Sequence, residues 1–86
     1  MNKQFVFFYT MKENAPEIRE VVPAHVAYWK AAALEGYRGG PFADRSGGLI
    51  TFRASELAEA VAIVEKDPFV VRGLLRERWT KEWVPE

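Results

Sequence analysis

The segment KQFVFFYT, residues 3–10, constrains the fold more than any other part of the chain. Aromatic and β-branched residues dominate it, which favours a β-strand. Its side chains do not alternate between apolar and polar, because one side carries Phe5, Phe7 and Tyr9 and the other carries Val6 and Phe8. A strand that is apolar on both sides is covered on both sides. We therefore expect this strand to lie within a sheet that is packed on each face.

The chain is too short to supply both covering layers. Its 86 residues correspond to one domain, residues 1–86, and a domain of this size buries only about 60% of its unfolded surface. Helices of the same chain can cover one face of the sheet. A second copy, packed sheet against sheet, would cover the other, so we expect a homodimer with closed symmetry.

Proline and glycine mark the next elements. We expect the main helix to run from Pro23 to Glu35, since proline suits a first helical turn and Gly36 a helix end. One kinked helix that begins at Pro16 is the alternative. The inward stripe would be spaced four, three and four, at Val22, Val26, Trp29 and Ala33.

Two strands and a second helix follow. Residues 37–43 contain Pro41 and suit an edge strand; residues 44–48 form a turn, and residues 49–53 suit a central strand. Ser55 could cap a helix that runs to about Lys66, with an inward face of Leu57, Val61 and Val64. Asp67-Pro68 would end that helix. A short turn closed by Gly73 and a strand over residues 74–84 complete the chain.

The resulting order is β-α-β-β-α-β. Right-handed crossovers and antiparallel pairing turn it into a ferredoxin-like α+β fold, with a four-stranded antiparallel sheet and two helices on one face. In this topology His25, Asp44 and Asp67 converge at one end of the fold. They are the only histidine and the only two aspartates of the chain.

These three residues could form an acid-base site. Histidine exchanges protons near neutral pH, and a neighbouring carboxylate can fix its tautomer and stabilise the imidazolium. Each residue also has a structural alternative: His25 could pack in the core, Asp67 could cap the turn after Pro68, and Asp44 could be an ordinary turn residue. The residues alone leave both interpretations open.

Other functional classes fit the composition poorly. Twelve basic residues balance twelve acidic ones, so we expect no binding to nucleic acid or to a membrane surface. One histidine and no cysteine make a metal site unexpected, and GGP at 39–41 is no nucleotide-binding fingerprint, so we expect no cofactor. No apolar run approaches the ~18 residues of a membrane span. These features suit a cytoplasmic protein.

Four motifs resemble those of the YCII-related, or YciI-like, proteins. They are PAH at 23–25, LEG at 34–36, GGPFAD at 39–44 and KDPFVVRGL at 66–74. The resemblance extends from the first strand to about residue 84. It implies a ferredoxin-like fold, a dimeric α/β barrel and a cleft centred on a histidine and an aspartate. The family histidine corresponds to His25, and the family acids correspond to Asp44 and Asp67.

The resemblance also implies a chemistry. One activity of such proteins is dehydrochlorination of a chlorinated hydroxyquinol, and muconolactone isomerases share the fold. We therefore expect a cofactor-independent lyase or isomerase that acts on a small cyclic or aromatic metabolite. His25, Asp67 and Asp44 would be catalytic, and the substrate would be bound by Gly40, Pro41, Phe42 and Trp29. The alternative is a non-catalytic module that binds a small ligand or mediates dimerisation.

Overall fold

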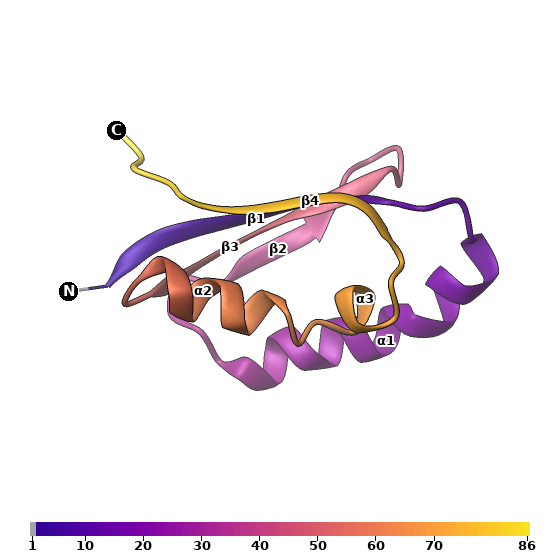
Figure 1. The fold of residues 1–86 in the computed structure, drawn as a ribbon, viewed down its shortest axis with the longest axis horizontal. Helices are drawn as coiled ribbons and strands as arrows, with labels where there is room; N and C mark the ends of the chain where they lie inside the picture. Colours follow the sequence, from indigo (N-terminus) through magenta and orange to yellow (C-terminus); the bar gives the residue numbers. More distant parts are fainter. Residues whose placement is uncertain (1) are drawn as a thin grey trace.

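The structure, a computed structural model, describes residues 2–86. Its elements are β1 (Lys3–Met11), α1 (Ala15–Ala32), β2 (Arg38–Pro41), β3 (Gly47–Ala54), α2 (Leu57–Val64), α3 (Pro68–Val71) and β4 (Leu75–Glu82). The strands form one antiparallel sheet in the order β2-β3-β1-β4. Figure 1 shows all three helices on the same side of this sheet. The expected ferredoxin-like α+β architecture is confirmed.

Strand β1 lies in the middle of the sheet and is apolar on both sides. Its buried aromatic residues, Phe5, Phe7 and Tyr9, face the helices and form the core with Trp29 and Phe52. On the opposite side Phe8 stacks on Trp79, with ring centroids 5.0 Å apart. We call this second side, with Val6, Phe8, Leu49 and Trp79, the open face. No helix of the described residues covers it (Figure 1).

Helix α1 is one continuous helix, so the expected start at Pro23 is wrong and the alternative start near Pro16 is correct. Pro16 occupies the first turn, where its missing N–H breaks no helical hydrogen bond. Pro23 lies inside the helix. The helix ends at Ala32 rather than Glu35, and Ala33 adopts the left-handed conformation (φ 49°) that was expected of a glycine.

The inward face of α1 also differs from the expected stripe. Val21, His25 and Trp29 are buried, at spacings of four and four, whereas Val22 and Val26 are 38% and 39% exposed. Trp29 is therefore the one residue that the expected stripe and the buried face of α1 have in common. His25 thus lies in the middle of α1 and faces inward, and it does not lie at the helix start.

Helix α2 buries small residues against the sheet. Ala60 and Val64 are buried, but the expected inward residues Leu57 and Val61 are 49% and 38% exposed. Ser55 does not cap the helix; its backbone N–H donates to Glu59 Oε1 (2.8 Å), and Glu56 occupies the N-cap position. None of the helices in residues 2–86 is long and apolar enough to cross a membrane.

Candidate functional site

Asp67 is a fully buried carboxylate at the start of α3. Its Oδ1 accepts a hydrogen bond from the backbone N–H of Phe69 (2.8 Å), which caps the short helix. Its Oδ2 accepts from the indole Nε1–H of Trp29 (2.9 Å). These two N–H groups can only donate, so they fix the orientation of the carboxylate independently of His25.

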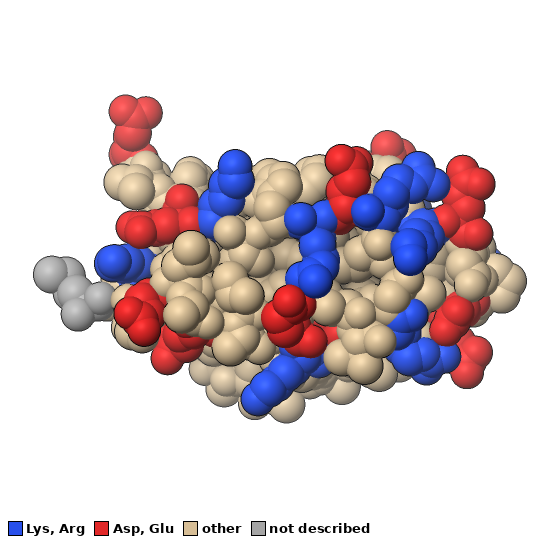
Figure 2. Space-filling model, viewed as in Figure 1, with Lys and Arg blue, Asp and Glu red and all other residues tan. Residues whose placement is uncertain are grey.

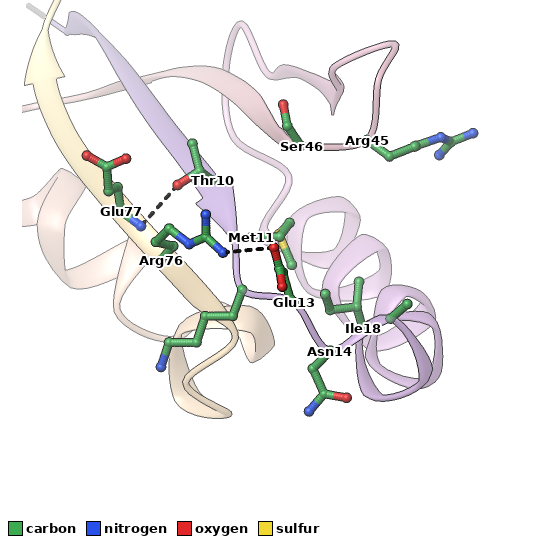
Figure 3. A pocket seen from close by; sticks show the side chains of 11 residues that line it. Thr10, Met11, Glu13, Asn14, Ile18, Arg45, Ser46, Arg76 and Glu77 are labelled. Atoms are coloured by element: carbon green, nitrogen blue, oxygen red, sulfur yellow. Dashed lines mark hydrogen bonds and ion pairs between the residues drawn. The ribbon is translucent and has the colours of Figure 1, made fainter.

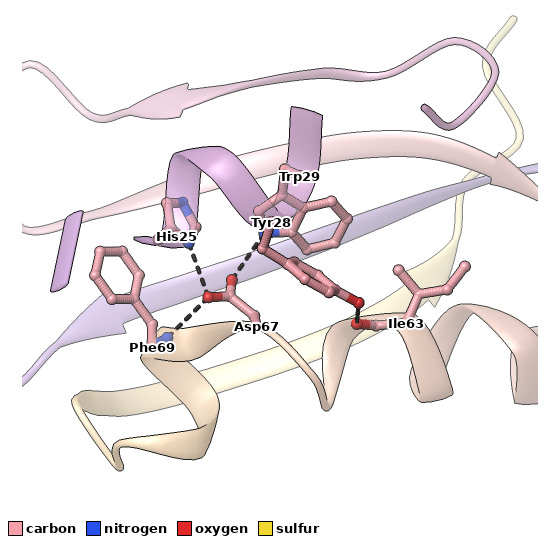
Figure 4. A network of polar contacts seen from close by, with 6 residues as sticks. All are labelled: His25, Tyr28, Trp29, Ile63, Asp67 and Phe69. Atoms are coloured by element: carbon pink, nitrogen blue, oxygen red, sulfur yellow. Dashed lines mark hydrogen bonds and ion pairs between the residues drawn. The ribbon is translucent and has the colours of Figure 1, made fainter. Parts of the chain in front are cut away.

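His25 provides the third contact of this carboxylate. Its Nδ1 lies 2.8 Å from Asp67 Oδ1 (Figure 4). The ring stacks on Phe69 at a centroid distance of 4.1 Å and meets the edge of Tyr9 at 6.0 Å. Because an ionised carboxylate oxygen can only accept, we expect Nδ1 to carry the proton and the neutral ring to keep its lone pair on Nε2.

The other imidazole nitrogen remains available. Nε2 of His25 makes no hydrogen bond with the described residues. Among these residues, every fully buried side-chain nitrogen or oxygen has a partner, so Nε2 is not fully buried. The arrangement combines a buried, hydrogen-bonded Nδ1 with an Nε2 that is unbonded and not fully buried, as a general base requires.

Tyr9 is a second polar group beside the imidazole. Burial, with smaller contributions from Asp67 and Tyr37, raises the pKa of the Tyr9 phenol to about 12. The phenol is therefore neutral over the physiological range and can donate a hydrogen bond. Its Oη has no hydrogen-bond partner among the described residues and, by the same reasoning as for Nε2, it is not fully buried.

A cavity of about 390 Å³ adjoins these residues. We call it the candidate pocket. Tyr9 and Phe69, the two rings that pack on His25, form part of its wall. Val22, one helical turn before His25, also lines it. The remaining lining residues are Met11, Ala15, Ile18, Arg19, Pro41, Arg45 and Gly47. A volume of this order suits a small ligand.

A larger depression of about 670 Å³ lies next to the candidate pocket (Figure 3). Its wall carries several charged residues, among them Glu13, whose carboxylate lies 3.7 Å from Arg76. His25 lines neither cavity, but only the smaller one is lined by Tyr9 and Phe69, the two rings that pack on its imidazole. We therefore regard the smaller cavity as the candidate site and the larger one as part of the surface around its mouth.

Comparisons with known proteins agree with this architecture. The model of the YCII-related domain matches residues 4–84. The chain belongs to the YCII-related family. A search of curated proteins returned no match.

A solved structure has the same fold as this YCII-related chain. It is the 5-chloro-2-hydroxyhydroquinone dehydrochlorinase TftG from Burkholderia phenoliruptrix, in complex with 2,5-dihydroxybenzoquinone. The TM-score is 0.78 and the sequence identity 24%, over 94% of this chain and 93% of that chain. At this identity the likeness establishes the fold.

Asp44, the other expected acid, is not joined to His25 by a hydrogen bond or ion pair. Its side chain is exposed in the turn between β2 and β3, where Oδ1 accepts from the backbone N–H (3.0 Å) and the hydroxyl (2.7 Å) of Ser46. These hydrogen bonds lower the pKa of Asp44. Asp44 therefore stabilises the turn that carries Arg45.

The four expected substrate-binding residues are dispersed. Pro41 lines the candidate pocket. Gly40 lies beside it on the same strand but is not part of the wall. Phe42 packs on Phe8, with centroids 5.7 Å apart, on the open face. Trp29 is fully buried and donates a hydrogen bond to Asp67.

Several residues of the site were not identified from the sequence. Tyr9 and Phe69 were assigned to a strand and a turn, and Arg19 and Arg45 were assigned no role. The DPF motif contained a usable signal, because an N-cap aspartate accepts from the backbone N–H two residues later and so holds Phe69 next to its own carboxylate. In the described residues, no group of three or more histidine, cysteine or acidic side chains could hold a metal ion.

Proposed function

We propose that this protein is a small enzyme of the YCII-related type, a lyase or isomerase that moves a proton on a small cyclic or aromatic metabolite without a cofactor. The observation that carries the proposal is the contact between His25 and Asp67, next to the rings of Tyr9 and Phe69, which line a ligand-sized cavity. Membership of the YCII-related family and the dehydrochlorinase activity of the structurally similar TftG support this choice of chemistry.

In the proposed reaction Nε2 of His25 is the general base. It removes a proton from a carbon next to a carbonyl or hydroxyl group, and the electron pair then moves into the ring or expels a leaving group such as chloride. Asp67 holds Nδ1–H and stabilises the imidazolium that forms. In an isomerisation the same nitrogen returns the proton to another carbon.

The rings around His25 support a planar substrate. Phe69 and Tyr9 form part of the pocket wall, and most of the other lining side chains are apolar. A cyclic compound could pack on them while the phenol of Tyr9 donates to one of its oxygens. 2,5-Dihydroxybenzoquinone, the ligand of TftG, is a compound of this size and shape, so it and 5-chloro-2-hydroxyhydroquinone are the first compounds to test.

A non-catalytic binding module is the second candidate. One observation favours it: Asp67 caps α3 and bonds Trp29, so a structural role alone accounts for its burial. His25 would then complete the packing of the carboxylate, and the pocket would bind a ligand without changing it.

An isotope experiment separates the two candidates. The protein is incubated in D₂O with 2,5-dihydroxybenzoquinone, and separately with 5-chloro-2-hydroxyhydroquinone, and ring deuteration and chloride release are followed. An enzyme should accelerate at least one process, and His25→Gln should reduce the rate by about 10²–10⁴-fold. Binding of these compounds with no acceleration, or equal rates in His25→Gln, would favour the binding module.

We also propose that the protein acts as a homodimer in which two open faces pack together. The support is chemical: Trp79 and Leu49 are 42% and 38% exposed on a face that already contains Phe8 and Val6. Burial of such a face against a second copy removes apolar surface from water. Each chain would contribute one domain, as expected for residues 1–86.

A further inference from the structure

The arginines of this chain are not equivalent. Four of the seven lie within 4.0 Å of a glutamate: Arg53, Arg72, Arg76 and Arg78. The other three, Arg19, Arg38 and Arg45, form no ion pair with the described residues. On the face shown in Figure 2, basic and acidic side chains are mixed and often lie next to one another. Three of the seven arginines are thus without a carboxylate partner among the described residues.

Two of these three arginines line the candidate pocket. Arg19 projects from α1 and Arg45 from the β2–β3 turn, and the pocket wall contains no aspartate or glutamate. Asp44 accepts from Ser46, and Asp67 is fully buried. Glu13 and Glu77 line the adjoining larger depression, where Glu13 lies 3.7 Å from Arg76. Figure 3 shows the Arg45 side chain extending from the turn, unpaired with the other side chains drawn.

The backbone around Arg45 is held in place. Arg45 adopts a left-handed conformation (φ 64°) that is uncommon for a residue with a side chain. Its N–H donates to the carbonyl of Phe42 (2.9 Å), and the Asp44 carboxylate holds the following residue, Ser46. These bonds hold the backbone of Arg45, a residue that lines the candidate pocket.

We propose that the candidate pocket selects small cyclic or aromatic acids in their anionic form, and that Arg45, assisted by Arg19, is the residue that determines this specificity. A guanidinium presents a planar pair of donors that matches a carboxylate. The ring of the ligand would pack on Tyr9 and Phe69, which brings it beside His25. This inference rests on the proposed function, because it takes the candidate pocket as the substrate site.

The test compares benzoate with benzamide, which has a similar shape and no charge. Binding is measured by titrating the ¹⁵N-labelled full-length chain with each compound and following amide and ring signals by NMR. We expect benzoate to bind at least ten times more tightly than benzamide and to shift signals of Tyr9, Phe69 and His25. The preference should decrease as ionic strength rises, because the guanidinium groups are exposed.

Arginine variants supply the matched comparison. Arg45→Gln should lower the affinity for benzoate about tenfold and leave that for benzamide unchanged, and Arg19→Gln should act in the same direction with a smaller effect. Arg38→Gln, which removes the same charge from an unpaired arginine outside the pocket, should change neither affinity. Dispersed amide spectra of each variant show that it is folded.

Three results would overturn the inference: equal affinities for benzoate and benzamide, an unchanged preference in the Arg19→Gln/Arg45→Gln double variant, or no benzoate binding at tens of millimolar. Equal affinities with shifts at His25 would leave the proposed function intact. Conversely, an Arg45-dependent preference without deuterium exchange in the catalytic assay would support anion selection while rejecting the acid-base proposal.

Discussion

Asp67 connects the stability of the fold to the chemistry proposed for it. The same carboxylate caps α3, accepts from the Trp29 indole and contacts Nδ1 of His25. A buried carboxylate is tolerated when donors satisfy its oxygens, and here three donors do so. The packing role and the chemical role therefore coexist, and experiments must remove one without the other.

Replacing Trp29 by phenylalanine removes the indole donor together with part of the buried ring volume. An aromatic ring remains in the core, but Asp67 Oδ2 loses its partner in a buried position. We expect the free energy of unfolding to decrease by about 1–3 kcal/mol, measured by urea denaturation. A stability unchanged from that of the wild type would show that the contact between Trp29 and Asp67 does not hold the carboxylate in place.

Tyr9 should make the fold sensitive to alkali. Its folded-state pKa is raised to about 12 from an ordinary value of 10.0, so the folded state keeps its proton while the unfolded state loses it. The resulting stabilisation is fully present below pH 10 and is lost as pH rises from about 10 to about 12. Tyr28, whose pKa is also raised, contributes in the same direction.

The Tyr9→Phe variant isolates this contribution. Its melting temperature should be close to that of the wild type at pH 7, because Tyr9 Oη has no hydrogen-bond partner among the described residues. Between pH 10 and 12 it should fall less steeply than that of the wild type. Parallel curves for the two proteins would mean that burial does not perturb this phenol.

At the scale of the elements, the sequence predicted the strands better than the helix faces. The apolar pattern of β1, the edge position imposed by Pro41 and the strand order follow from local residue types and topology rules. The face of α1 does not, because Val21 and Val22 are both apolar and either could begin a stripe. The contact between His25 and Asp67 decides in favour of Val21, and it joins residues 42 positions apart.

The same limit applies to the candidate site. Topology and the family motifs placed His25, Asp44 and Asp67 together at one end of the fold, and in the structure Nδ1 of His25 lies 2.8 Å from Asp67 Oδ1. They could not separate Asp67 from Asp44, since that depends on the side-chain hydrogen bonds of a turn. Nor could they place Tyr9 and Arg45 at the pocket, because these residues reach it through sheet pairing and an irregular backbone conformation.

Strand β3 begins with two glycines, and at both positions a Cβ atom would collide with atoms of Tyr9. A Cβ atom at Gly48 would lie 2.3 Å from the Tyr9 Oη atom, whereas one at Gly40, on the neighbouring strand, would meet nothing within 4 Å. We expect Gly48→Ala to destabilise the fold by about 1–3 kcal/mol and to displace the Tyr9 ring. Gly40→Ala should be nearly neutral in the same denaturation experiment, and similar losses in both would contradict this account of the strand.

At the scale of the whole molecule, the two faces of the sheet differ in what covers them. The helices cover one face, and the open face retains exposed apolar side chains, among them Trp79. The charge of the chain is balanced, with twelve basic and twelve acidic residues, so repulsion between copies is weak. Both features favour association of two open faces.

Sedimentation equilibrium tests the dimer. The wild-type chain should have about twice the 9.8 kDa mass of the monomer. Trp79→Glu, which places a charge on the open face, should shift the equilibrium to the monomer. Leu57→Glu makes the same kind of change at an exposed position on the helix side and should leave the mass unchanged. A monomeric wild type at all concentrations would contradict the dimer.

The most direct test of the acid-base proposal is the ¹⁵N NMR spectrum of the His25 ring. The chain has one histidine, so both ring signals belong to His25. With the ring neutral, we predict a proton on Nδ1, held by Asp67, and a bare lone pair on Nε2 that exchanges hydrogen bonds with water. A proton on Nε2 in the neutral ring would mean that Asp67 does not set the tautomer, and His25 could not act as the base proposed here.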